Sequence, residues 1–141
     1  MTTTGYPYEH TINVIYRDID AMRHVNNTVY FTYMETTRVQ FLMDKMGVTH
    51  IDEIPTVVAE TTCSFKSPAF LGETLTVGMG VSRFGNKSFD IIYRIQAQDG
   101  RLVATAKSVH VIFDQATQKS APIPEDFRAK IEALQKDWTP E

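Results

Sequence analysis

The chain has 141 residues, of which 43% are hydrophobic and 22% are charged, and its formal net charge is −3. This balance is typical of one ordinary globular domain with a single sizeable core. The acidic balance argues against a nucleic-acid binder that relies on a strongly basic surface.

The cysteine count and the N-terminus indicate the compartment. Cys63 is the single cysteine, so no intrachain disulfide can form, and one thiol suits a reducing compartment. The first ten residues have neither the basic start nor the apolar run of a secretory signal, and no apolar run approaches the ~20 residues that span a bilayer. We therefore expect a cytoplasmic protein without membrane insertion.

The first segments of the chain predict a tail, a strand and a loop. Residues 1–7 are expected to form a flexible tail. Residues 8–16 alternate and are rich in β-branched and aromatic types, which predicts a strand. Residues 17–26 are polar and predict a loop.

A long helix is predicted from about Asn27 to Lys45, where apolar residues recur at helical spacing. Asn26 or Asn27 can serve as its N-cap, because a short amide side chain accepts from the free amides of the first turn. Gly47 is a suitable C-terminal stop.

The remainder of the chain predicts mainly strands, which cover residues 56–66, 73–83, 88–98 and 101–113. Asp99-Gly100 is a strong two-residue hairpin signal between the last two. Because turns separate these strands, we expect an antiparallel meander with one face covered by the long helix. A short helix is expected over about 125–136.

Several standard sites are missing from the sequence, including the phosphate-binding, dinucleotide-binding and nucleophile-elbow patterns. Gly78 and Gly80 lie inside a strand pattern and indicate a bulge or the close approach of another segment. Metal binding through Asp18, Asp20 and His24 is one alternative, although loop acids with amides are common without a metal.

The strongest candidate site is the pair of acids, Asp18 and Asp20, that precedes the long helix. The first amides of a helix lack partners and carry partial positive charge, so they can polarise a carbonyl. A carboxylate beside that carbonyl can attack it, or can draw a proton from an attacking water. The alternative is that both acids only cap a turn.

The motifs around this site resemble those of the hotdog-fold acyl-CoA thioesterases, a group that includes 4-hydroxybenzoyl-CoA thioesterase and bacterial acyl-CoA thioester hydrolases. The resemblance spans roughly residues 8–125. The matching residues are Tyr16-Arg17-Asp18-Ile19-Asp20-Ala21-Met22, His24-Val25-Asn26-Asn27, Tyr30, Glu35, Arg38, Phe65-Lys66-Ser67-Pro68-Ala69, Gly72-Glu73, Gly85-Asn86-Lys87-Ser88-Phe89, Val111-Ile112-Phe113-Asp114 and Pro122-Ile123-Pro124. Many relatives carry a small residue where this chain has Met22-Arg23.

The resemblance implies an α+β fold, a single hotdog domain over residues 8–141. In this fold a curled antiparallel sheet wraps around one long central helix, and a short helix ends the chain. It maps the catalytic carboxylate onto Asp20 and the amide that binds the thioester carbonyl onto Asn27. It implies that Asp18 shapes the loop, and that His24 and Asn26 order the site.

The resemblance also implies contacts to the coenzyme A part of the substrate. Lys87 matches a position that contacts the phosphates, Arg83 is nearby, and Ser88 could contact the pantetheine arm. Thr61 and Thr62 are expected near the reacting centre, where they could orient the water. The alternatives are that Lys87 is only solvated and that the threonines only pack within their strand.

An acyl slot and an oligomer are further expectations. Tyr30, with Tyr33, Met34 and Phe65, could line the slot, although aromatic and Met residues at helical spacing are more often core. The resemblance implies a homodimer, often paired into a tetramer, with the site at the subunit interface.

The favoured function is hydrolysis of an acyl-CoA thioester to a carboxylic acid and free CoA, without a metal or redox cofactor. Asp20 acts either as nucleophile or as general base. One alternative is a hydroxyacyl-thioester dehydratase, which would need a catalytic histidine on a helix that has none. The other is a non-catalytic acyl-CoA-binding module.

Overall fold

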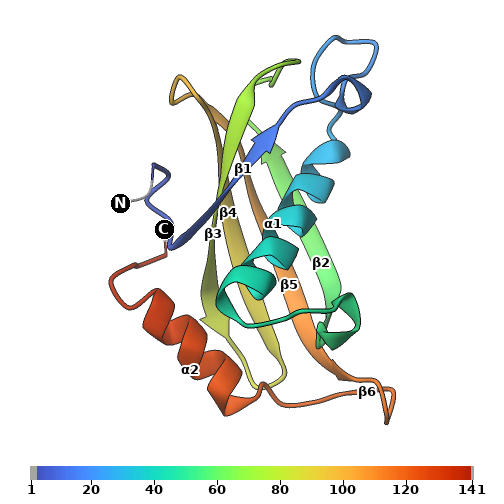
Figure 1. Cartoon of the computed structure of the whole chain (residues 1–141), viewed down its shortest axis with the longest axis vertical. Helices are drawn as coiled ribbons and strands as arrows, with labels where there is room; N and C mark the ends of the chain where they lie inside the picture. Colours follow the sequence, from blue (N-terminus) through green and yellow to red (C-terminus); the bar gives the residue numbers. More distant parts are fainter. Residues whose placement is uncertain (1–2, 141) are drawn as a thin grey trace.

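A long helix lies across one face of a curled antiparallel sheet in the computed structural model, which describes residues 3–140 (Figure 1). The strands are β1 (Tyr8–Asn13), β2 (Thr56–Phe65), β3 (Thr74–Phe84), β4 (Ser88–Ala97), β5 (Leu102–Asp114) and β6 (Lys119–Ser120). The helices are α1 (Val29–Lys45) and α2 (Glu125–Leu134), with short 3-10 turns at Tyr16–Asp18 and Ile51–Glu53. This confirms the predicted hotdog architecture.

The strand order is β1-β3-β4-β5-β2, with β6 paired to β5. The predicted meander is therefore right for β3, β4 and β5 and wrong for β2, which pairs with β5. The connection over residues 66–73 is no tight turn. Its backbone bonds instead to other segments, as in Lys66 N–H to the Val103 carbonyl and Gly72 N–H to the Val14 carbonyl. The chain thus crosses from one edge of the sheet towards the other.

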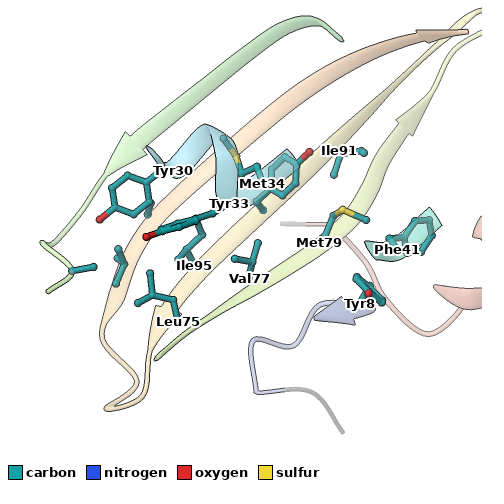
Figure 2. Close-up of a cluster of buried hydrophobic side chains, with 14 of the residues drawn as sticks. Tyr8, Tyr30, Tyr33, Met34, Phe41, Leu75, Val77, Met79, Ile91 and Ile95 are labelled. Atoms are coloured by element: carbon teal, nitrogen blue, oxygen red, sulfur yellow. The ribbon is translucent and has the colours of Figure 1, made fainter. Parts of the chain in front are cut away.

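The sheet curls because it packs around one face of α1. The buried residues of that face are Tyr30, Tyr33, Met34, Thr37 and Phe41. Figure 2 shows four of them gathered with sheet residues such as Leu75, Val77 and Ile95. Each large apolar side chain that is fully buried contributes about 1.5–3 kcal/mol. The Thr37 hydroxyl donates to the Tyr33 carbonyl at 2.8 Å, so this buried polar group keeps a partner.

The ends of α1 differ slightly from the prediction. The regular helix begins at Val29, two residues later than expected, after Thr28 at the N-cap position. The side chain that accepts a hydrogen bond at this end is Asn26, whose Oδ1 takes the Thr28 N–H at 2.9 Å. At the other end Gly47 has a φ of 74°, as the stop signal predicted. No helix among the described residues has the length and apolarity to cross a membrane.

Residues 3–7 cover the outer face of the sheet, so the prediction of a flexible tail is wrong for them. Residues 1–2 of that tail lie outside the described part. Tyr6 is buried and its ring lies 5.3 Å from that of Trp138. A Cβ on Gly78 would collide with the Thr4 side chain, and one on Gly80 would lie 2.5 Å from the Trp138 ring. The close approach predicted at these glycines is confirmed.

Candidate active site

Asp20 lies in a short loop that folds back on itself before α1. Its amide donates to the His24 carbonyl at 3.2 Å, and its carbonyl accepts from the Arg23 amide at 2.9 Å. Arg23 has a φ of 68°, in the left-handed region that favours glycine. This explains why a small residue suits the position, and why the loop turns sharply enough to bring Asp20 back towards the helix start.

The Asp20 carboxylate is half-buried and each of its oxygens is held by one donor. Oδ1 accepts from the Met22 amide at 2.9 Å. Oδ2 accepts from the side-chain amide of Asn26 at 3.0 Å. These two bonds fix the orientation of the carboxylate, and its remaining lone pairs stay available to a substrate or a water.

Asn26 links this carboxylate to the start of α1. Its Oδ1 accepts from both the amide and the hydroxyl of Thr28, at 2.9 and 2.6 Å. Within residues 3–140, no hydrogen bond uses the backbone N–H of Asn27, the next residue along. The structure therefore places an oriented carboxylate and an unused amide just before the helix in one loop.

Asp18 is occupied by structural contacts. Its Oδ2 accepts from the Ile15 amide at 3.1 Å and from the Tyr33 hydroxyl at 2.8 Å. Burial, together with this bond to Asp18, raises the pKa of Tyr33. Asp18 thus ties the loop to the buried face of α1. Among the described residues no three His, Cys, Asp or Glu side chains form a group that could hold a metal, so the alternative through Asp18, Asp20 and His24 finds no support.

A shallow pocket opens beside Asn27, and His24 and Tyr30 line it together with Phe65. The His24 Nδ1 lies 3.3 Å from the Val25 carbonyl, which fits an ordering role in the turn. Tyr30 is buried, its ring lies 5.5 Å from that of Phe65, and burial raises its pKa to about 12. Tyr30 is therefore a neutral, fixed wall of this pocket.

The two candidate threonines of β2 face opposite sides of the sheet. Thr61 lies opposite Ser108, and Thr62 lies opposite Lys107. Neighbouring side chains on a strand alternate between faces. Thr62 lines a pocket on the outer face together with Tyr6, so a role beside Asp20 does not fit it within one chain.

The candidate contacts for coenzyme A lie on the β3–β4 hairpin, and two of them already bond to the protein. Arg83 forms two hydrogen bonds with the Asp90 carboxylate, at 3.1 and 3.0 Å, and donates to Ser88 Oγ at 3.1 Å. These contacts hold the pKa of Asp90 below its ordinary value. Lys87 is exposed and forms no ion pair among the described residues.

This hairpin and the Asp20 loop lie at opposite ends of the sheet (Figure 1). Ser88 is paired with Val111, and Phe65, which lines the pocket at Asn27, is paired with Ala104. The seven residue steps from Ala104 to Val111 along β5 span about 23 Å at the usual rise of a strand. One chain therefore does not bring Lys87, Ser88 and Arg83 to Asp20.

A buried polar group on the inner face of the sheet was not predicted from the sequence. Arg38 of α1 donates to the Tyr93 hydroxyl, which bonds to Ser108 Oγ, which in turn bonds to His110 Nε2. No motif in the sequence assigns a role to His110. The available signal was the alternation of β5, which places Ser108 and His110 on the apolar face.

Comparisons with known proteins identify the family of the chain. Residues 14–131 match the model of the Thioesterase-like superfamily. The long-chain acyl-CoA thioesterase FadM of Escherichia coli is 28% identical over 121 residues, which cover 84% of this chain and 92% of that protein.

Solved structures share the fold over nearly the whole chain. A thioesterase from Thermus thermophilus, complexed with coenzyme A and Zn, has a TM-score of 0.86 and 30% identity, and the match covers 94% of this chain and 96% of that one. A 1,4-dihydroxy-2-naphthoyl-CoA thioesterase from Synechocystis, at 19% identity, shares the fold with a TM-score of 0.79 over 88% of this chain and 94% of that one. With its acid loop ahead of the central helix and a family match over most of its length, the chain belongs to the Thioesterase-like superfamily.

Proposed function

We propose that this protein hydrolyses an acyl-CoA thioester to a carboxylic acid and free CoA. One observation carries the proposal: the Asp20 carboxylate is oriented by Asn26 in the same loop as the unused N–H of Asn27. The relationship to FadM, and to a thioesterase that binds coenzyme A, supports acyl-CoA as the substrate class.

In the proposed reaction the Asn27 N–H donates to the thioester carbonyl oxygen and stabilises the negative charge that develops there. Asp20 then acts in one of two ways. It attacks the carbonyl carbon, which expels the CoA thiolate and leaves an anhydride for water to hydrolyse, or it takes a proton from a water that attacks directly. Carboxylate and amide suffice for either route, so the reaction as proposed needs no metal or redox cofactor.

We further propose that the working unit is a homodimer, or a tetramer built from it, because one chain leaves the site incomplete. β2 is an edge strand among the described residues, and it exposes Val57 and Val58. Antiparallel pairing of β2 with β2 of a second copy reverses the two ends. It would bring the hairpin with Lys87 of one copy towards the Asp20 loop of the other.

The test is release of CoA thiol, followed with a disulfide dye across short, long and aromatic acyl-CoAs. Asp20→Asn should lose most of the turnover at an unchanged thermal midpoint. Asp52→Asn removes an exposed acid that makes no hydrogen bond among the described residues, and it should keep wild-type rates. An Asp20→Asn protein with wild-type turnover would sink the proposal.

A further inference from the structure

A cavity of about 270 Å³ lies between α1, the sheet and α2. Most of its wall is apolar, and Figure 2 shows three of the wall residues, Phe41, Met79 and Ile91. Protein interiors are close-packed, and an unfilled apolar cavity lowers stability in proportion to its volume. A largely apolar space of this size is suited to receive an apolar group of a ligand.

Arg38 and His110 are polar residues in this wall, and they stand at the two ends of one hydrogen-bond chain. The Arg38 Nη1 lies 3.2 Å from the Tyr93 hydroxyl, that hydroxyl lies 2.6 Å from Ser108 Oγ, and Ser108 Oγ lies 2.7 Å from His110 Nε2. Tyr93, Ser108 and His110 are all buried. Arg38 and His110 are thus held in fixed positions.

The direction of this chain determines what His110 offers to the cavity. Since Arg38 can only donate, the Tyr93 oxygen accepts from it. Ser108 Oγ is the one acceptor that the described residues offer to the Tyr93 proton, so Tyr93 donates to Ser108. Ser108 in turn donates to Nε2, so the remaining ring proton of His110 sits on Nδ1. Burial and the charge of Arg38 lower the pKa of His110 to about 4, which keeps the ring neutral.

The Nδ1–H of His110 is a free donor. No described residue pairs with Nδ1, and the single buried side-chain nitrogen or oxygen without a partner in residues 3–140 is the Arg101 Nε. Nδ1 is therefore not fully buried. Because His110 lines the cavity, the cavity is the space that Nδ1 faces.

Arg38 brings a positive charge that no acid neutralises. Within residues 3–140 no Asp or Glu forms an ion pair with it. Glu35 also lines the cavity, but it is exposed and lies where water screens its charge. The apolar cavity thus carries one free guanidinium and one free N–H donor, and a carboxylate is the group that matches both.

The cavity and the reaction site share one helix. Asn27 precedes the first turn of α1 and Arg38 lies 11 residues further on, which is about 16 Å at the usual rise of a helix. We propose that the cavity receives the far end of the acyl group, and that Arg38 and His110 select acyl chains ending in a carboxylate. This inference rests on the proposed function and names its substrate class.

The experiment uses matched pairs of acyl-CoAs that end in either a carboxylate or a methyl group, from about six to about sixteen carbons. Hydrolysis is measured as kcat/KM. Binding is measured separately by calorimetry with the matching S-alkyl-CoA thioethers, which cannot be hydrolysed. Arg38→Met removes the charge and keeps the apolar stem, with Arg38→Gln as a second variant if it fails to fold. Lys45→Met removes a charge from α1 outside the cavity wall.

The expected result is a preference of about tenfold or more for the carboxylate end at one or more lengths, in both rate and binding. Arg38→Met should bring the ratio to about one, and Lys45→Met should leave it unchanged. A wild type without preference at every length, or a preference that survives in Arg38→Met, overturns the inference. If the thioethers show the preference but wild type hydrolyses no thioester, the proposed function fails and the selective cavity stands.

Discussion

The side-chain amide of Asn26 lies 3.0 Å from Asp20 Oδ2, and the Oδ1 of the same side chain accepts from the amide of Thr28, the N-cap residue that precedes α1. One residue therefore orients the proposed catalytic carboxylate and holds the chain at the start of α1, next to the proposed carbonyl-binding amide of Asn27. Its two jobs use different atoms, so substitutions can separate them.

Asn26→Ser should separate catalysis from capping. Serine still caps a helix start, but it is too short to keep the bond to Asp20. We expect kcat to fall about tenfold to a hundredfold, since the carboxylate loses its orientation, while the thermal midpoint stays near that of the wild type. Asn26→Ala should lose the same activity and also about 1 kcal/mol of stability. Enzyme assays and thermal denaturation would show this, and equal kcat in wild type and Asn26→Ser would contradict it.

Because of the ion pairs of Asp90, the free energy of unfolding should fall as the pH is lowered. The pKa of this carboxyl is lowered chiefly by its hydrogen bonds to Arg83, so its stabilising contribution is complete above the unfolded pKa and disappears as pH falls through the folded one. Asp90→Asn should lower the free energy of unfolding by about 1–3 kcal/mol at pH 7. The gap between wild type and variant should close between about pH 5 and about pH 2, as urea titrations across that range would show. A constant gap would rule out the ionised carboxylate as its source.

Gly80→Ala should destabilise the protein through the C-terminal segment. The new Cβ would lie 2.5 Å from the Trp138 ring, so the ring must move off the sheet. We expect a loss of about 1–3 kcal/mol in the free energy of unfolding. In a Trp138→Ala background the same substitution should cost much less, and a double-mutant cycle would measure this coupling. Additive effects would mean that the ring is not what excludes the side chain.

Val57→Lys should break the proposed dimer, since a charge on a long edge strand opposes pairing with another strand. Light scattering should show a dimer or tetramer for wild type and a monomer for the variant. The monomeric variant should also have a lower kcat/KM than the wild type. Leu134→Lys is the control, because Leu134 is equally exposed but lies on α2. A wild type that is monomeric and fully active would contradict the dimer.

The type and order of the helices and long strands followed from the sequence, because apolar periodicity and turn residues act locally. The pairing of β2 did not, since the break at Ser67-Pro68 shows where a strand ends and not which strand it meets. The buried Tyr6 was missed for a related reason: its partner Trp138 is at the other end of the chain.

The contacts of the candidate site were likewise predictable only where they are local in the sequence. That Asp20, Asn26 and Asn27 share one loop was predictable because seven or fewer residues separate them, whereas the roles proposed for them come from the family resemblance. Asp90 was missed as the partner of Arg83, because the pair depends on the register of β3 against β4. The link from Arg38 to His110 was missed as well, since it passes through three elements and no local pattern joins its residues.

In the proposed selection, the position of the guanidinium along α1 determines the length of the preferred acyl chain. Residues three or four positions apart lie on the same face of a helix. An arginine placed elsewhere on α1 would therefore face the cavity only if it is three or four residues away from position 38. Leu42 lies one turn beyond Arg38 on the same wall. Moving the arginine from position 38 to position 42 would change the length of the preferred acyl chain by about 6 Å. The acyl preference would then change without any change at Asp20.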